Sequence, residues 1–156
     1  MNPSKYRVSV EIRHPSKDLS EVYSTLGKIN GFTSGILWTV GQARTNMRGE
    51  HIPGMASFSR CFYRFPKDEP ESTSIENIAV VVDRLVKVLN SQKAILHPVT
   101  SDGGTIDITV GWFIDKNSGE VFGAELLKEM SELNISFGFD VYPADQDASA
   151  FTSETD

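Results

Sequence analysis

Apolar and polar residues alternate with a period of two in three parts of the chain. These segments span residues 6–12, 105–115 and 135–141. Each has one apolar and one polar face, which is typical of a strand with one buried side. A fourth run, residues 58–65, has aromatic side chains on both faces and fits the strand pattern less well. Residues 94–99 are consistent with a fifth, short strand, and Pro98 favours an edge position.

Apolar residues recur with helical spacing in three other segments. These cover residues 19–26, 75–89 and about 124–133. Asp18 with Glu21 fits a capping arrangement before the first segment, and Thr73 with Glu76 has capping-box spacing at the second. The second segment has the broadest apolar stripe, so we expect it to be the main helix of the core.

Helices with one apolar stripe need a sheet to cover, and alternating strands need only one covered face. Both demands are met by a mostly antiparallel sheet with three helices on one face. We therefore predict an α+β fold, a ferredoxin-like sandwich, formed by a single domain over residues 1–142. Residues 143–156 lose the periodicity and are rich in Asp, Ser, Thr and Ala, which is typical of a disordered C-terminal tail.

Charge divides unevenly along the chain. The net charge is −6, but residues 1–64 hold nine Lys and Arg against four Asp and Glu, whereas residues 65–156 hold six against seventeen. An acidic chain is a poor candidate for direct nucleic-acid binding, which depends on neutralising phosphates. Either the asymmetry is scatter over one solvated surface, or an acidic face meets a basic partner.

Several observations bear on the cellular location. The single cysteine, Cys61, cannot form an internal disulfide, which fits a reducing compartment. We see no N-terminal apolar segment of the signal-peptide kind and no apolar run of the ~20 residues that a membrane helix needs. We therefore expect a cytoplasmic protein with no membrane association.

Few residues indicate catalysis, metal binding or phosphate binding. His14, His51 and His97 lie on separate segments without metal-ligand spacing, so we expect neither a metal nor another cofactor. Cys61 has mostly aromatic neighbours, which favours a buried structural thiol over a nucleophile. The Asp-Gly-Gly run at 102–104 predicts a hairpin turn rather than a phosphate-binding loop.

The segment from residue 38 to 54 is predicted to be a long loop, and such loops in compact domains are usually functional or disordered. Arginine side chains recognise carboxylate or phosphate groups in two-point contacts, and a tryptophan can anchor an interface. The alternative is that the tryptophan belongs to the core and the arginines are solvated. The candidate partner- or ligand-binding residues are Trp38, Arg44, Arg48, Glu50, His51, Arg60 and Arg64.

A second group of polar residues is expected on the uncovered face of the sheet: Glu11, Arg13, Asp107 and Asp140. Asp107 and Asp140 fall on strands that can be adjacent, with Glu11 nearby, and paired carboxylates serve acid–base hydrolysis. A solvated sheet face with Arg13 as counter-ion has the same composition, so both interpretations stay open.

Several motifs together resemble a bacterial family, the domain-of-unknown-function family 4279. They are Ser-Lys-Asp-Leu-Ser-Glu-Val-Tyr-Ser-Thr-Leu-Gly at 16–27, Trp-Thr-Val-Gly at 38–41 with Arg-Gly-Glu at 48–50, the helix at 75–89 and the ending at 126–142. The likeness covers residues 6–142. Family members often carry a Pro-Thr pair soon after the first helix, where this chain reads Lys-Ile-Asn-Gly-Phe-Thr. The resemblance implies a fold and a bacterial or phage origin, and no activity.

Three functions are consistent with these observations. The first is a non-catalytic binding protein, most concretely a small inhibitor or immunity-type protein that occludes a protein partner such as a basic toxin or nuclease. The second is a sensor domain for a small anionic ligand. The third is a hydrolase that uses the sheet-face carboxylates or His51. An uncovered sheet face or edge strand also allows pairing with a second copy, which gives a homodimer.

Overall fold

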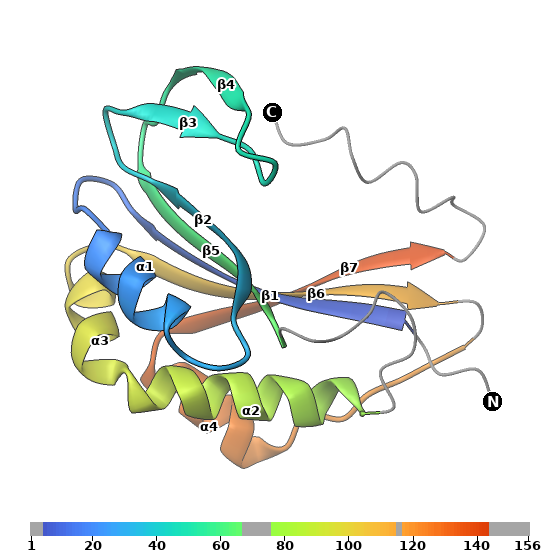
Figure 1. Cartoon of the computed structure of the whole chain (residues 1–156). Helices are drawn as coiled ribbons and strands as arrows, with labels where there is room; N and C mark the ends of the chain where they lie inside the picture. Colours follow the sequence, from blue (N-terminus) through green and yellow to red (C-terminus); the bar gives the residue numbers. More distant parts are fainter. Residues whose placement is uncertain (1–4, 67–75, 115–116, 144–156) are drawn as a thin grey trace.

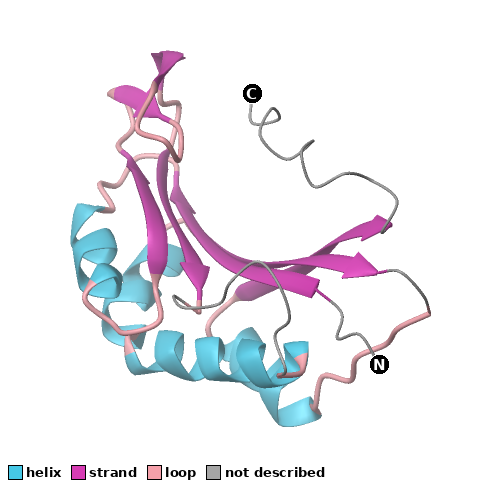
Figure 2. Ribbon diagram, turned by 45° about the vertical axis from the view of Figure 1, so that its right-hand side comes forward, coloured by secondary structure: helices cyan, strands magenta, loops and turns pink. Residues whose placement is uncertain are grey.

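A computed structural model describes residues 5–66, 76–114 and 117–143. Its described part is a curved five-stranded sheet with helices on one face, and a separate two-stranded hairpin beyond one end of the sheet (Figures 1 and 2). The elements in chain order are β1 (Lys5–His14), α1 (Ser20–Gly27), β2 (Thr33–Trp38), β3 (Ala43–Thr45), β4 (His51–Met55), β5 (Ser59–Phe65), α2 (Ile78–Ser91), α3 (Lys93–Ser101), β6 (Thr105–Ile114), α4 (Ala124–Glu132) and β7 (Ile135–Pro143).

The strand order of the large sheet is β2-β5-β1-β6-β7. The pairings of β2 with β5, β5 with β1 and β1 with β6 are antiparallel, whereas β6 and β7 run parallel. The parallel pair requires a crossover, and α4 supplies it. The sheet is therefore mixed, and the predicted α+β class is confirmed, while the finer ferredoxin-like assignment stays a prediction.

The core lies between the sheet and the helices. Val10, Ile12, Ile106 and Ile108 alternate toward the helices and are buried, as the period of two predicted. They meet the apolar stripe of α2, including Leu85. Complete burial of such a side chain stabilises the fold by about 1.5–3 kcal/mol, so this layer dominates the free energy of folding. None of the helices in the described ranges lies over the opposite face of the sheet, which is concave in Figure 2.

Four helices cover the sheet in the described part of the chain, so the predicted three were wrong. Residues 94–99, expected to be a strand, lie inside α3 together with Pro98. Leu96 and Val99 are buried and stand three residues apart, which is helical spacing. A short apolar run fits either period, so the pattern alone did not separate the two states.

The 102–104 segment joins α3 to β6, so the predicted hairpin turn there was wrong. Gly103 does adopt a positive φ of 93°, and the Gly104 N–H donates to the Val99 carbonyl at 2.8 Å. These features end a helix rather than reverse a strand.

Other predicted boundaries also shift. α2 begins at Ile78, after Asn77, and continues to Ser91, so the predicted start at residue 75 was early. Position 73 of the predicted capping box lies outside the described residues. So does the predicted tail, 143–156, apart from Pro143, which ends β7.

Cys61 and His14 are both buried in the fold. The Cys61 thiol is buried, and burial raises its pKa to about 12, as expected for an unreactive thiol. His14 is likewise buried, with only 1% of its surface exposed. Its Nδ1 accepts the N–H groups of Ser16 (3.0 Å) and Lys17 (2.7 Å), and its Nε2 lies 2.9 Å from the Asp102 carbonyl oxygen. His14 therefore ties the turn after β1 to the end of α3.

Candidate functional site

The segment predicted as a loop after Trp38 folds into its own antiparallel hairpin, β3 and β4. Arg44 pairs with Ile52 and Thr45 pairs with His51, with a register shift beside them. The hairpin extends beyond the ends of β2 and β5 (Figure 1). Backbone hydrogen bonds from Gly41 to Ala56 and from Ala56 to Gln42, both 2.8 Å, close its base. The segment is thus an ordered arm.

Trp38 attaches this arm to the sheet. It is buried on the open face of β2, in a small second core with Ile36 and Ala56. Its indole Nε1–H donates to the Thr45 carbonyl oxygen at 2.7 Å. Trp38 therefore belongs to a core, the alternative named above, and does not present its ring to a partner.

Two predicted binding arginines stack on that indole. The guanidinium carbons of Arg44 and Arg60 lie 5.4 and 4.8 Å from the Trp38 ring centroid, within the range of a cation–π contact. Arg44 also donates from Nη2 to the Pro53 carbonyl oxygen at 2.6 Å, and Arg60 donates from Nε to Glu11. Both side chains are committed to internal contacts that brace the hairpin.

The turn between β3 and β4 is organised by Asn46. Its Oδ1 accepts the N–H groups of Arg48 (2.9 Å) and Glu50 (3.0 Å), and its Nδ2 donates to a Glu50 carboxylate oxygen at 2.8 Å. Gly49 completes the turn with a φ of 78°. Asparagine bonding to nearby backbone groups is a common way to fix a turn. Glu50 is thus partly a turn residue, while the Arg48 and His51 side chains are exposed at the tip.

The hairpin also carries apolar residues that the sequence did not single out. Met47 and Met55 are 43% and 68% exposed. Flexible, polarisable methionine side chains are over-used at protein-binding surfaces. A hairpin fixed by its own hydrogen bonds that still presents two methionines to solvent has the properties of a contact surface.

The open face of the sheet holds the second predicted group. The strand registers place Glu11 opposite both Phe62 and Asp107, with Ser136 beyond Asp107. Glu11 is the shared acid of Arg13, at 2.6 Å, and of Arg60. Glu11 and Asp107 thus lie side by side on this face, and Glu11 neutralises Arg13 of the second group and Arg60 of the first.

Asp107 and Asp140 lie on adjacent strands, as the sequence allowed, but they do not form a carboxylate pair. Asp107 pairs with Ser136, whereas Asp140 pairs with Gly111, four residues further along β6. At about 3.3 Å per residue this separates the two positions by about 13 Å. Asp107 instead accepts a hydrogen bond from the Thr105 hydroxyl at 3.2 Å. Alternation gives the face of a residue but not its register, so the sequence did not show this separation.

Arg64 lies on the same open face, opposite Ser9 and Thr33. It stands four residues from Arg60 along β5, again about 13 Å in an extended strand. The candidate residues therefore separate into three places: a brace made by Trp38, Arg44 and Arg60, an exposed tip, and Arg64 on the face of the sheet.

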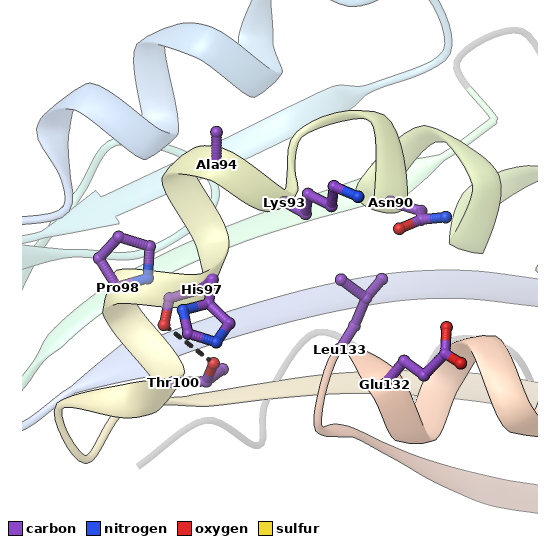
Figure 3. Close-up of a pocket in the computed structure, with 8 residues that line it drawn as sticks. All are labelled: Asn90, Lys93, Ala94, His97, Pro98, Thr100, Glu132 and Leu133. Atoms are coloured by element: carbon purple, nitrogen blue, oxygen red, sulfur yellow. Dashed lines mark hydrogen bonds between the residues drawn. The ribbon is translucent and has the colours of Figure 1, made fainter.

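A groove of about 560 Å³ lies elsewhere, between the end of α2, α3 and the end of α4. Figure 3 shows Lys93 and Asn90 above it and Glu132 across from them. These polar side chains are exposed, and the Thr100 hydroxyl donates to the His97 carbonyl oxygen at 3.3 Å. None of the polar side chains that line the groove is buried.

The described residues contain no group of three or more His, Cys, Asp or Glu side chains arranged to hold a metal ion. Among the helices in the described ranges, none combines the length and apolar character needed to cross a membrane.

Comparisons with protein-family models, with curated proteins and with solved structures found no match to this chain. The resemblance to family 4279 therefore stays a prediction.

Proposed function

We propose that this chain is a non-catalytic binding protein that engages a protein partner through the β3–β4 hairpin. One observation carries the proposal: the hairpin is braced from within, yet Met47 and Met55 remain 43% and 68% exposed at its surface. A preformed surface loses little conformational entropy on binding, which favours affinity.

The candidate residues then have two roles. Trp38, Arg44 and Arg60 hold the hairpin in place through the indole stack and the Thr45 hydrogen bond. Arg48 and His51, together with the methionines, contact the partner. Arg64 on the neighbouring sheet face extends the surface.

The most concrete form of this function is an inhibitor or immunity-type protein that occludes a basic toxin or nuclease. The net charge of −6 supports it, since an acidic protein is steered toward a basic partner before contact. Glu125, Glu129 and Glu132 on α4 contribute to this charge. An anion sensor is less well supported, because Glu11 already pairs with Arg13 and Arg60.

We also propose that β1, α1, β2, β5, α2 and β6 form a ferredoxin-like core. The order β2-β5-β1-β6 with antiparallel neighbours supports this assignment. α3, α4, β7 and the hairpin are then additions to that core, so the proposed binding surface is one of them.

The test uses the full chain with a photo-crosslinking residue in place of Met55, and a second version with the same residue in place of Val80 on α2. Val80 is 50% exposed and lies on α2, in the layer of helices. Cells of the source organism should yield one defined protein crosslinked to position 55 and not to position 80.

That protein is then purified, and its affinity is measured for the natural chain, for the Met47→Ser/Met55→Ser double variant and for Val80→Ser. We expect at least about tenfold weaker binding for the hairpin variant and no change for the helix variant, because loss of an interface anchor costs more than 1 kcal/mol. Unchanged affinity of the hairpin variant would refute the proposed surface. For the inhibitor, stoichiometric addition of the natural chain must also suppress the partner's activity.

A further inference from the structure

β7 forms an edge of the large sheet. Within the described residues no strand pairs with that edge, because β7 is the last strand in the order. β7 is nine residues long, keeps an unshifted register with β6 throughout and carries Asp140 as its single charged residue. Natural edge strands are usually shortened, bulged or charged to prevent pairing. β2 at the other edge follows that rule, with six residues and a register shift between Thr33 and Ile36.

Apolar side chains line one face of this edge strand. Phe137 and Phe139 pack on each other and on Phe122, with ring centroids 4.8 to 5.7 Å apart. Phe139 and Val141 nevertheless remain 40% and 52% exposed. A backbone edge with which no described strand pairs and an exposed apolar row on the same strand define a surface for strand addition.

We propose that β7 pairs antiparallel with β7 of a second copy of this chain, about a two-fold axis through Phe139, which joins two sheets into one of ten strands. Residue 139 is the midpoint of Ile135–Pro143, so this register pairs all nine residues. Phe139 then faces its own copy, and Phe137 faces Val141 of the second copy. Aromatic and aliphatic cross-strand pairs of this kind stabilise antiparallel sheets.

The polar face of β7 favours a second copy over an unrelated peptide. In the same register Asp140 lies opposite Gly138 of the other copy, so the like charges do not meet. A Cβ atom built at Gly138 would have no heavy atom within 4 Å, which leaves room for the incoming carboxylate. Ser136 likewise faces Tyr142. The strand is thus complementary to itself when reversed, as an isologous interface requires.

The first test is sedimentation equilibrium of the natural chain, of Val141→Lys and of Val80→Lys. Val80 has nearly the same exposure as Val141 but lies on α2, so it is a matched control. We expect the natural chain and Val80→Lys to be dimers, and dimerisation of Val141→Lys to weaken about tenfold or more, because each dimer receives two lysines in apolar pairs. A monomeric natural chain, or a dimer unaffected by Val141→Lys, would overturn the proposal.

The second test examines the register by disulfide formation and does not depend on the folding of Val141→Lys. In a Cys61→Ser background, Phe139→Cys places two thiols on opposite copies at the axis, where Cα atoms of an antiparallel pair are about 4.5–5.5 Å apart. Under mild oxidation this variant should form a disulfide-linked dimer much faster than Gly138→Cys, whose thiol faces Asp140. Equal rates for the two variants would exclude this register.

Discussion

Replacing Trp38 with Phe should loosen the β3–β4 hairpin while leaving the main sheet intact. The substitution keeps an aromatic ring in the second core but removes the Nε1–H that bonds to the Thr45 carbonyl oxygen at 2.7 Å. It also shrinks the ring on which Arg44 and Arg60 stack at 5.4 and 4.8 Å. The effect is local because these contacts all join the hairpin to one end of the sheet.

The magnitude follows from the three lost terms. A net hydrogen bond contributes about 1 kcal/mol. Weaker stacking of two guanidinium groups removes about 0.5 kcal/mol, and the lost ring volume costs a similar amount. The total of about 2 kcal/mol corresponds to about a thirtyfold change in the equilibrium between the attached and detached hairpin. A two-stranded hairpin without that attachment is marginally stable, so its own hydrogen bonds should open with it.

Amide hydrogen exchange measures this opening directly. Protection of the Gly41, Asn46 and Ala56 amides, which donate hydrogen bonds inside the hairpin, should fall by about thirtyfold. Amides in β1 and β6 should change little. Unchanged protection in the hairpin would refute its attachment through the indole, and an equal fall in β1 and β6 would show that Trp38 belongs to the cooperative core instead.

Three further predictions concern the core and its edges. Burial raises the pKa of the Cys61 thiol to about 12, so this thiol should resist a thiol reagent at pH 8 in the native chain and react fully in denaturant. The stability contributed by the neutral buried thiol should be present below pH 9.0, the pKa of an exposed thiol, and should decline above it. The hydrogen bond and charge of Lys17 lower the pKa of Asp102 below 3.8. The Asp102 carboxylate therefore contributes stability above pH 3.8, and this contribution is lost as the pH falls through the lowered pKa. The difference in melting temperature between the natural chain and Asp102→Asn should vanish on acidification from pH 6 to 2. His14→Ala should lower the free energy of unfolding by about 2–4 kcal/mol in urea titrations, because it strands buried hydrogen-bonding groups, and His14→Asn should restore part of it through an oxygen that accepts the Ser16 N–H. Equal effects of Ala and Asn would contradict the hydrogen-bonding role.

The elements with long, regular patterns were predictable from the sequence. β1, β6 and β7 each alternate over at least seven residues, and α2 carries an uninterrupted apolar stripe, so one physical period dominates in each. The open face was predictable for the same reason, since alternation fixes which residues turn away from the helices. Register was not, because it depends on partners far away in the chain. The sequence therefore allowed adjacent strands for Asp107 and Asp140 but could not show that the two positions stand four residues apart.

Short elements escaped prediction for a related reason. β2 is six residues long and contains Gly35, which lies close to Tyr63 and Tyr23, so tertiary packing and not strand preference sets its conformation. A Cβ at Gly35 would stand 2.6 Å from the Tyr63 ring, which shows how tightly the aromatic side chains close over this strand. α3 likewise depends on the burial of Leu96 and Val99 against the rest of the core.

Residue type directed attention to the segment after Trp38, but the structure gives its tryptophan and two of its arginines a different role from the one expected. Trp38, Arg44 and Arg60 attracted notice because cations and an indole often mark interfaces, and here the same chemistry acts inside the molecule, where each guanidinium meets the ring and an oxygen. The Asn46 and Gly49 pair was the sequence signal that the segment is an ordered turn. Because the brace occupies Arg44 and Arg60, two of the four arginines that the sequence favoured, the exposed Met55 tests the proposed binding surface more directly than Arg44 does.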